Sequence, residues 1–357
     1  MFHTITLTVA LAWSAWIADR SAAPRWVDSL PEDVRKAVLW QADHEEGTLH
    51  DWQYDNPKDS GGGIFNTGTA DEAVAEVASS AAFTGRYGMK ATIRNAYRCR
   101  NGKKAVRLMR WTDKPWDQGG QEFPTEAYYS VWMMVPENYN PNKEPPWDPG
   151  DGGWWNVFQF TSYDKAHESQ PVWVLNLLRD DASGRLRFHF YTKYNTPQFR
   201  KCADHEVPVG KWFHIEAFYQ CSGRNREDGR IVFWLNGQEL LSAGGVTTRL
   251  HEGVVWGIGN YTDHIDGGAV SGTASVYFDD AVVSTKPVHP FAAAFLRGRT
   301  DPRAATQIPK AMGCPSSVSD RPPPRTAGHD ASGRGRLSSR AAGQGPAPTA
   351  PHASRAR

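Results

Sequence analysis

The chain has 357 residues, and its 40 basic and 39 acidic side chains give a formal net charge of +1. This balance provides no whole-protein field to hold a polyanion such as nucleic acid, so we expect no nucleic-acid partner. Aromatic residues make up 12% of the chain, including 15 Trp. Such side chains either fill a β-rich core or stack on sugar rings.

The N-terminus carries an uncharged apolar run from Phe2 to Ala18, followed by the small residues Ser21-Ala22-Ala23. The run is shorter than the ~20 residues that span a membrane. It resembles the core of a secretory signal and its cleavage site, although only His3 precedes it where basic residues are usual. We expect residues 1–23 to be a signal peptide and the protein to be secreted or periplasmic, without a membrane span. The alternative is an ordinary buried N-terminal segment.

Elements are predicted from local patterns. Ser29 and Glu32 match a capping box and predict a short helix over about residues 30–36. After it, β-type runs alternate with Gly, Pro, Asn and Asp and predict about twelve strands. These lie near Val38–His44, Ala73–Ala78, Tyr87–Arg94, Ala105–Trp111, Glu126–Val135, Trp154–Phe160, Val172–Leu178, Leu186–Tyr194, Trp212–Tyr219, Arg230–Leu235, Val254–Tyr261 and Ser275–Val283. The pattern predicts an all-β fold, an antiparallel β-sandwich of the jelly-roll type.

Turn signals separate these strands. Asn236-Gly237 supplies the positive φ angles of a tight hairpin, and the glycines at 61–63 predict a loop. From Pro287 the sequence changes to Ala, Pro, Arg, Ser and Gly without a period. Residues after about Pro302 cannot bury enough apolar area to offset chain entropy. We therefore predict one domain over residues 24–287 and a disordered basic low-complexity tail over 288–357.

The four cysteines, Cys99, Cys202, Cys221 and Cys314, have no metal-ligand spacing. One disulfide among the first three would suit an exported protein.

The strand near 186–194 has two different faces, because successive strand residues alternate between faces. One face is apolar and belongs in a core: Leu186, Phe188 and Phe190. The other is polar: Arg187, His189, Tyr191 and Lys193. A row of cation, imidazole, phenol and cation would suit an anionic sugar, with Arg187 and Lys193 as substrate-binding residues. The alternative is a solvated outer face.

Two other strands carry polar residues on informative faces. In Trp154–Phe160, alternation places Gln159 on the face opposite Asn156. In Ala105–Trp111, Arg107 and Arg110 point to opposite faces, so only one of them can face a groove.

Several runs together resemble the heparin-lyase-I-like polysaccharide lyases, a family of concanavalin A-like jelly rolls. They are Glu126–Pro136, Trp155–Phe160, Pro171–Asn176, Val209–Glu216, Gly229–Gly237 and Ser275–Asp280, and the likeness spans about Val38 to Ser284. The resemblance implies two curved antiparallel sheets with a groove on the concave face. It also implies an anionic polysaccharide as partner and β-elimination at a uronic acid as reaction.

The resemblance assigns roles to particular residues. The family's arginine maps to Arg107 or, with a weaker match, Arg110, and its glutamine maps to Gln159. These groups neutralise the uronate carboxylate and so acidify the C5 proton. The family's late tyrosine maps to Tyr261, which protonates the leaving O4.

The chain departs from the family pattern at two positions. Thr161 stands where the family has a histidine, and Gly257 stands where a lysine is expected. His189 or Tyr191, from the neighbouring strand, could then supply the base.

Three other interpretations compete with a lyase. A non-catalytic glycan-binding module of the lectin or laminin-G type would use the same groove without an acid and a base. A retaining glycoside hydrolase would need two carboxylates about 5 Å apart, and the acidic residues Glu216, Glu227-Asp228 and Asp279-Asp280 do not form the required repeat. A structural or adhesion domain without a sugar ligand is the third.

The proposed chemistry requires no cofactor. Asp279-Asp280 could hold a structural calcium ion through carboxylate oxygens, or could accept hydrogen bonds from loop backbone. We expect the protein to be a monomer.

Overall fold

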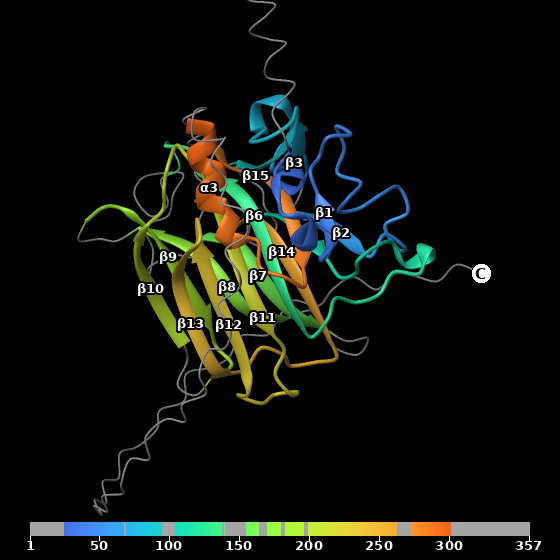
Figure 1. Cartoon of the computed structure of the whole chain (residues 1–357), viewed down its shortest axis with the longest axis vertical. Coiled ribbons are helices and arrows are strands. Elements are labelled where there is room, and N and C mark those ends of the chain that lie inside the picture. The colour runs from blue at the N-terminus through green and yellow to red at the C-terminus, as the bar shows by residue number, and fades with distance from the viewer. Residues whose placement is uncertain are drawn as a thin grey trace, which may run out of the picture. The chain divides into compact units, whose positions relative to one another are not determined.

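The computed structural model describes residues 25–67, 69–94, 104–137, 139, 155–163, 170–179, 183–195, 199–262 and 273–300. All of them lie in the first of two compact units, Met1–Ala311; the second unit, Met312–Arg357, lies outside the described residues. Most described residues are in strands, which form two antiparallel sheets (Figure 1). The predicted all-β antiparallel sandwich is confirmed.

The larger sheet has eight strands in the order β13-β12-β11-β6-β15-β4-β3, with β1 also paired to β15. Its strands are β1 (Val38–Ala42), β3 (Ala73–Ala78), β4 (Gly88–Arg94), β6 (Glu126–Met134), β11 (Trp212–Gln220), β12 (Gly229–Leu235), β13 (Gln238–Val246) and β15 (Thr273–Ser284).

The smaller sheet has seven strands in the order β10-β9-β8-β7-β14-β5-β2. They are β2 (Gly62–Asn66), β5 (Lys104–Arg110), β7 (Trp155–Tyr163), β8 (Gln170–Arg179), β9 (Leu186–Thr192), β10 (Phe199–Glu206) and β14 (Gly253–Thr262).

The helices are short or terminal: η1 (Val27–Ser29), α2 (Glu32–Arg35), η2 (Ser79–Ala81), η3 (Trp116–Gln118) and α3 (His289–Thr300). Helix α2 lies where a helix was predicted, but the capping box was wrong. Pro31 occupies the N-cap position, and the Ser29 hydroxyl instead donates to the Trp26 carbonyl at 2.6 Å. No helix of the described residues is long and apolar enough to cross a membrane.

The inner faces of the two sheets share one core, and much of the aromatic content is buried there. Phe160 of β7 stacks on Tyr219 of β11 with 3.8 Å between ring centroids, so one ring pair joins the two sheets. Phe158 contacts both Trp256 and Phe233 in the same layer. Packing of this kind is what fixes the two sheets face to face.

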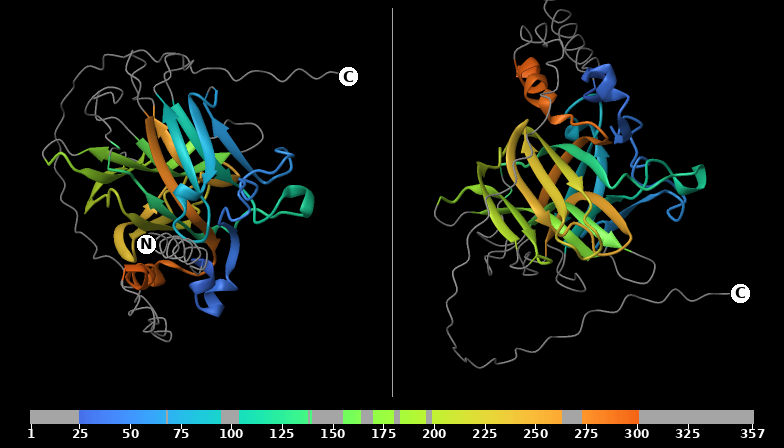
Figure 2. Two further views of the ribbon diagram at one scale, coloured as in Figure 1. Left: turned by 90° about the horizontal axis from the view of Figure 1, so that it is seen from above. Right: turned by 60° about the horizontal axis from the view of Figure 1, so that its bottom comes forward.

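A second apolar cluster covers the outer face of the eight-stranded sheet. Figure 2 shows α3, in orange, and the helices η1 and α2, in blue, on the same side of this sheet. Trp26, Phe83 and Phe295 surround Trp132 of β6, with ring centroids 4.4 to 5.9 Å from it. The predicted domain boundary at residue 287 was therefore wrong, because α3 contributes buried apolar side chains to the domain.

Three strands were not among the predicted ranges, β2, β10 and β13, although the predicted hairpin implies β13. The glycines at 62 and 63 belong to β2 and not to a loop. A side chain does not fit at Gly62, where a Cβ would lie 2.1 Å from the Trp52 carbonyl oxygen. The Asn236-Gly237 hairpin is confirmed, with φ angles of 50° and 86° between β12 and β13.

Cys221 is a free, half-buried thiol, and burial raises its pKa to about 11. A disulfide through Cys221 is therefore not formed. The side chains of Cys99, Cys202 and Cys314 lie outside the described residues, as do the predicted signal peptide and the tail beyond Thr300.

Candidate functional site

Strand β9 presents the predicted polar row to one side of the seven-stranded sheet. Leu186, Phe188 and Phe190 are buried in the core between the sheets. Arg187, His189 and Tyr191 alternate with them and are half-buried on the opposite side, as expected. The Arg187 guanidinium donates to the Asp204 carbonyl of β10 at 2.9 Å. Lys193 follows the end of the strand and is exposed.

The strand register brings most predicted residues onto this same side. Tyr261 of β14, Asn156 of β7, Asn176 of β8 and His189 of β9 are successive cross-strand partners. We call this side of the sheet the polar face and define it by these seven residues: Arg107, Asn156, Gln159, Asn176, His189, Tyr191 and Tyr261. Tyr261 and His189 are three strand spacings apart, about 14 Å.

A second cross-strand row runs beside the first. It consists of Gly257, Gln159, Val174 and Tyr191 on the same four strands. Gln159 therefore lies between the two tyrosines of the polar face.

Asn156 joins the polar face through a β-bulge that alternation does not predict. Asn156 pairs with Asn176, while Phe158 pairs with Leu175, so β7 holds one extra residue, Val157. Both Val157 and Phe158 are buried in the core. The expectation that Asn156 faces away from Gln159 was wrong because the bulge reverses the alternation.

Arg107 lies above the Tyr261 ring. Its guanidinium carbon is 4.9 Å from the centroid of Tyr261 and 6.0 Å from that of Phe65. Burial lowers the pKa of Arg107, while Tyr261 acts in the opposite direction. The Arg107 Nε has no hydrogen-bond partner among the described residues. A desolvated cation with an unused donor is suited to bind an anion.

Arg110 lies on the opposite side of β5 and does not reach the polar face. Its guanidinium donates to the carbonyls of Thr112 and Ser60, each at 2.8 Å, and of Asp51 at 3.1 Å. It also stacks on Trp40, and burial lowers its pKa to about 10. The structure therefore places the weaker of the two arginine candidates among backbone carbonyls of the interior.

The floor of the polar face is made of amides. Asn156, Gln159 and Asn176 are each 3% exposed. Gln159 Nε2 lies 3.3 Å from Met109 Sδ. Asn156 and Asn176 were not proposed as site residues from the sequence. The only available signal was an asparagine inside an otherwise apolar strand.

The two departures from the family pattern also lie in this floor. At Gly257 a Cβ would lie 2.1 Å from Met109 Sδ, so Met109 occupies the space that a lysine would need. Thr161 is buried, and its hydroxyl has no partner among the described residues. A base for β-elimination at this face would have to come from another strand, such as β9 with His189 and Tyr191.

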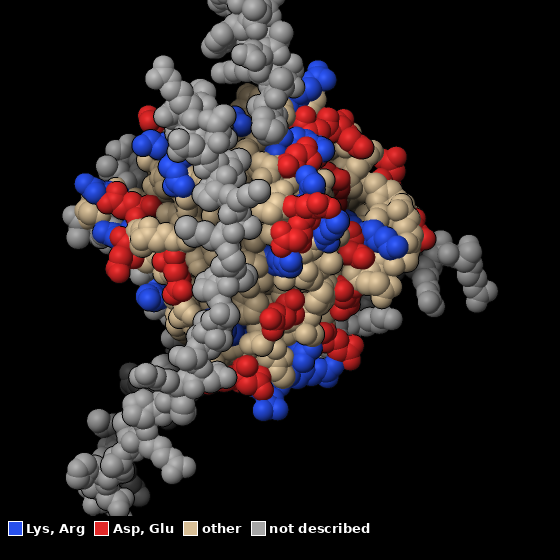
Figure 3. Space-filling view, viewed as in Figure 1, with Lys and Arg blue, Asp and Glu red and all other residues tan. Residues whose placement is uncertain are grey.

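Acidic residues are absent from the five interior strands of this sheet. None of β5, β14, β7, β8 and β9 contains Asp or Glu. A glycoside hydrolase mechanism, which needs two carboxylates, therefore has no support on these strands. By contrast, Figure 3 shows basic and acidic side chains interspersed over the face in view.

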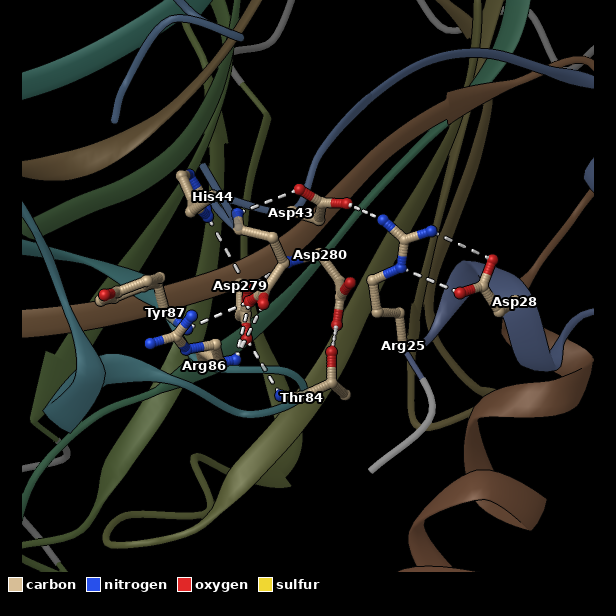
Figure 4. A network of polar contacts seen from close by, with 10 residues as sticks. Arg25, Asp28, Asp43, His44, Thr84, Arg86, Tyr87, Asp279 and Asp280 are labelled. Atoms are coloured by element: carbon tan, nitrogen blue, oxygen red, sulfur yellow. Dashed lines mark hydrogen bonds and ion pairs between the residues drawn. The ribbon is translucent and has the colours of Figure 1, made fainter. Parts of the chain in front are cut away.

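The Asp279-Asp280 pair lies in the eight-stranded sheet and has structural partners (Figure 4). Asp279 accepts from the backbone amides of Phe83 at 2.7 Å and Thr84 at 3.1 Å, and Asp280 accepts from the Thr84 hydroxyl at 2.6 Å. Burial raises the pKa of both carboxyl groups, and the three amides that bond Asp279 offset part of its shift. Among the described residues, no group of three or more His, Cys, Asp or Glu could hold a metal ion.

The two packed sheets, one with a polar face, define a jelly-roll domain of the concanavalin A-like type. The chain belongs to the polysaccharide lyase family: the model of this family, described as "Polysaccharide lyase", matches residues 44–282. This range contains every residue of the polar face. The narrower resemblance to heparin-lyase-I-like enzymes stays a prediction.

Solved structures with a similar course of the chain include an endo-β-1,4-glucuronan lyase from the fungus Trichoderma reesei, with 14% identity, a TM-score of 0.49, and coverage of 70% of this chain and 96% of that one. The cellulose induced protein Cip1 is similar at 15% identity and a TM-score of 0.39, covering 70% and 98%. The alginate lyase Aly36B is similar at 15% identity and a TM-score of 0.33, covering 62% and 86%. No curated protein sequence is significantly similar to the chain.

Proposed function

We propose that this protein is an exported, monomeric lyase that cleaves a uronic-acid-containing polysaccharide by β-elimination on the polar face, without a required cofactor. The observation that carries the proposal is the arrangement of Arg107 over Tyr261 on a sheet whose interior strands contain no acidic residue. On these interior strands an anionic chain meets cations and amides and no like charge.

In the proposed reaction, the role of each participating residue follows from its position on the polar face. Arg107 and Gln159 bind the uronate carboxylate, which disperses negative charge and acidifies the proton on C5. Tyr191 or His189 takes that proton, and the C5–H electron pair forms the C4=C5 double bond as the C4–O4 bond breaks. Tyr261 donates its phenolic proton to the leaving O4. In the order of the strands, Tyr261 of β14 and the two candidate bases of β9 lie on opposite sides of the amides of β7 and β8.

A glycan-binding module without catalysis is the second candidate. Two observations favour it: Met109 fills the place of the family's lysine, and Thr161 stands in place of its histidine. Binding would use the same polar face.

One assay separates the two candidates. β-Elimination creates an unsaturated uronate that absorbs ultraviolet light, whereas binding creates no new absorbance. Alginate, glucuronan, heparin and hyaluronan are each incubated with the full chain and with Tyr261→Phe. A lyase gives rising absorbance on at least one polymer, lost in the variant, while the variant still binds that polymer. Binding without absorbance on every polymer supports the module, and unchanged turnover in Tyr261→Phe removes the acid assignment.

A further inference from the structure

Asn156 has an amide orientation that its surroundings determine. Its Nδ2 lies 3.2 Å from the Phe158 carbonyl oxygen and 3.5 Å from that of Leu175. Carbonyl oxygens only accept hydrogen bonds, so the atom that faces both must be the nitrogen. The same Nδ2 lies 3.4 Å from Oδ1 of Asn176 and donates to it.

This donation sets the orientation of the second amide. Since Asn176 Oδ1 faces the donor on Asn156, Asn176 Nδ2 faces β9, where it lies 3.5 Å from His189 Nδ1. An amide nitrogen can only donate. His189 Nδ1 must therefore accept, and a neutral imidazole that accepts at Nδ1 carries its proton on Nε2.

We infer that Asn176, oriented by Asn156, is a positioning residue that holds His189 in the Nε2–H tautomer. Neutral His189 then carries its proton on Nε2 and cannot take a second proton there. This inference rests on the proposed function and resolves an alternative that the function leaves open: the base is Tyr191.

The proton balance of the step is then complete. The step requires Tyr191 to act as the phenolate, which takes the C5 proton and becomes neutral. The C5–H electron pair forms the C4=C5 bond, the C4–O4 pair leaves with O4, and Tyr261 protonates O4 and becomes the phenolate. Solvent exchange returns both tyrosines to their starting states, and no charge is created or lost. His189 remains neutral throughout.

The tautomer can be measured without any substrate. Long-range proton–nitrogen correlation spectra of the full chain with ¹⁵N-labelled histidine show which ring nitrogen carries the proton. We expect Nδ1 of His189 to be unprotonated in the wild type.

In Asn176→Asp a carboxylate, which only accepts, faces the ring, so Nδ1 should become protonated. Asn156→Ala removes the orienting donor and should give a mixture of tautomers. Asn66→Asp, at an exposed position of β2, is the matched control and should leave the spectrum unchanged.

A protonated Nδ1 in the wild type overturns the inference, and so does an unprotonated Nδ1 in Asn176→Asp. On a polymer that the protein cleaves, Tyr191→Phe should lose at least about 100-fold in turnover, and His189→Gln should lose less than Tyr191→Phe does. The reverse order of these two losses also overturns the assignment. If no polymer is cleaved the proposed function fails, but the spectra still decide the tautomer.

Discussion

The outer faces of the two sheets carry similar polar side chains that differ in how deeply they are buried. On the eight-stranded sheet, His214 and Glu216 of β11 are fully buried beneath α3 and the N-terminal segment. Glu216 accepts from the backbone amides of Val288 and His289 and from the His289 ring at 2.5 Å. On the seven-stranded sheet, His189 and Tyr191 remain half-buried.

The comparison indicates that a polar side chain of this fold has a structural role where a helix covers it. The residue type alone does not distinguish it from a polar side chain of the candidate site. Burial lowers the pKa of His214 to about 3, so this imidazole stays neutral at any ordinary pH. Glu216 serves to bond the start of α3 to the sheet. On the other sheet, no helix of the described residues lies over the polar face, and His189 and Tyr191 keep exposed surface beside the buried amides Asn156 and Asn176.

Strand β5 carries one arginine on each side, so it allows the same comparison within a single strand. Replacing its buried arginine gives the largest expected effect on stability. Arg110→Met leaves the carbonyls of Asp51, Ser60 and Thr112 without their donor, so we expect the free energy of unfolding to fall by about 4 kcal/mol. Urea denaturation measures this loss. Arg107→Met is the matched control and should cost less than about 1 kcal/mol. Equal losses would show that the two sides of β5 do not differ as described.

Arg107→Met should instead affect catalysis. Loss of the cation beside Tyr261 removes stabilisation of the developing carboxylate charge, so turnover should fall by about 100-fold, or about 2.7 kcal/mol. The measurement is the rate of absorbance increase on a polymer that the wild type cleaves. Arg230→Met is the control, because Arg230 is exposed on β12 of the other sheet. A similar fall in both variants would contradict a special role for the polar face.

His214→Phe tests, through the pH dependence of stability, whether the covered outer face of the eight-stranded sheet excludes protons. The pKa of His214 is near 3 in the folded chain, against an ordinary value of 6.5, so the unfolded chain binds the extra proton between these values. Wild-type stability is therefore complete above about pH 6.5 and falls as the pH drops towards 3. Between pH 8 and pH 5 the wild type should lose about 2 kcal/mol more than the variant. Parallel losses in urea melts at the two pH values would mean that His214 is accessible to protons.

Asp280→Asn should change stability with the opposite dependence on pH. Burial and the neighbouring Asp279 charge raise the pKa of Asp280, so its carboxyl stays neutral when the unfolded chain has ionised. Its contribution to stability is present below about pH 4 and is lost as the pH rises. The variant should therefore gain stability relative to the wild type as the pH rises from 4 to 7. Asparagine tolerates the φ of 46° at this position. Thermal melts at both pH values, with exposed Asp71→Asn as control, would show a reversed or absent gain if Asp280 were ionised.

A structural feature could be predicted from the sequence when it depends on residues that are close together in the chain. The faces of β9 were predicted correctly, because alternation is a local property of any strand. The orientation of Asn156 was not, since a bulge depends on partners in β8 and β14. Helix α3 was assigned to the tail, because its few apolar residues become informative only when Trp26 and Trp132 lie against them.

The sequence by itself determined the strand-rich composition, the hairpin at Asn236-Gly237 and the two-sided character of individual strands, because these depend on neighbours a few residues apart. Only the tertiary structure decided that Arg107, and not Arg110, shares a face with Gln159 and Tyr261, and that Asn156 and Asn176 lie between Tyr261 and His189. Register across four strands sets those contacts, and register depends on packing between segments up to 150 or so residues apart in the chain.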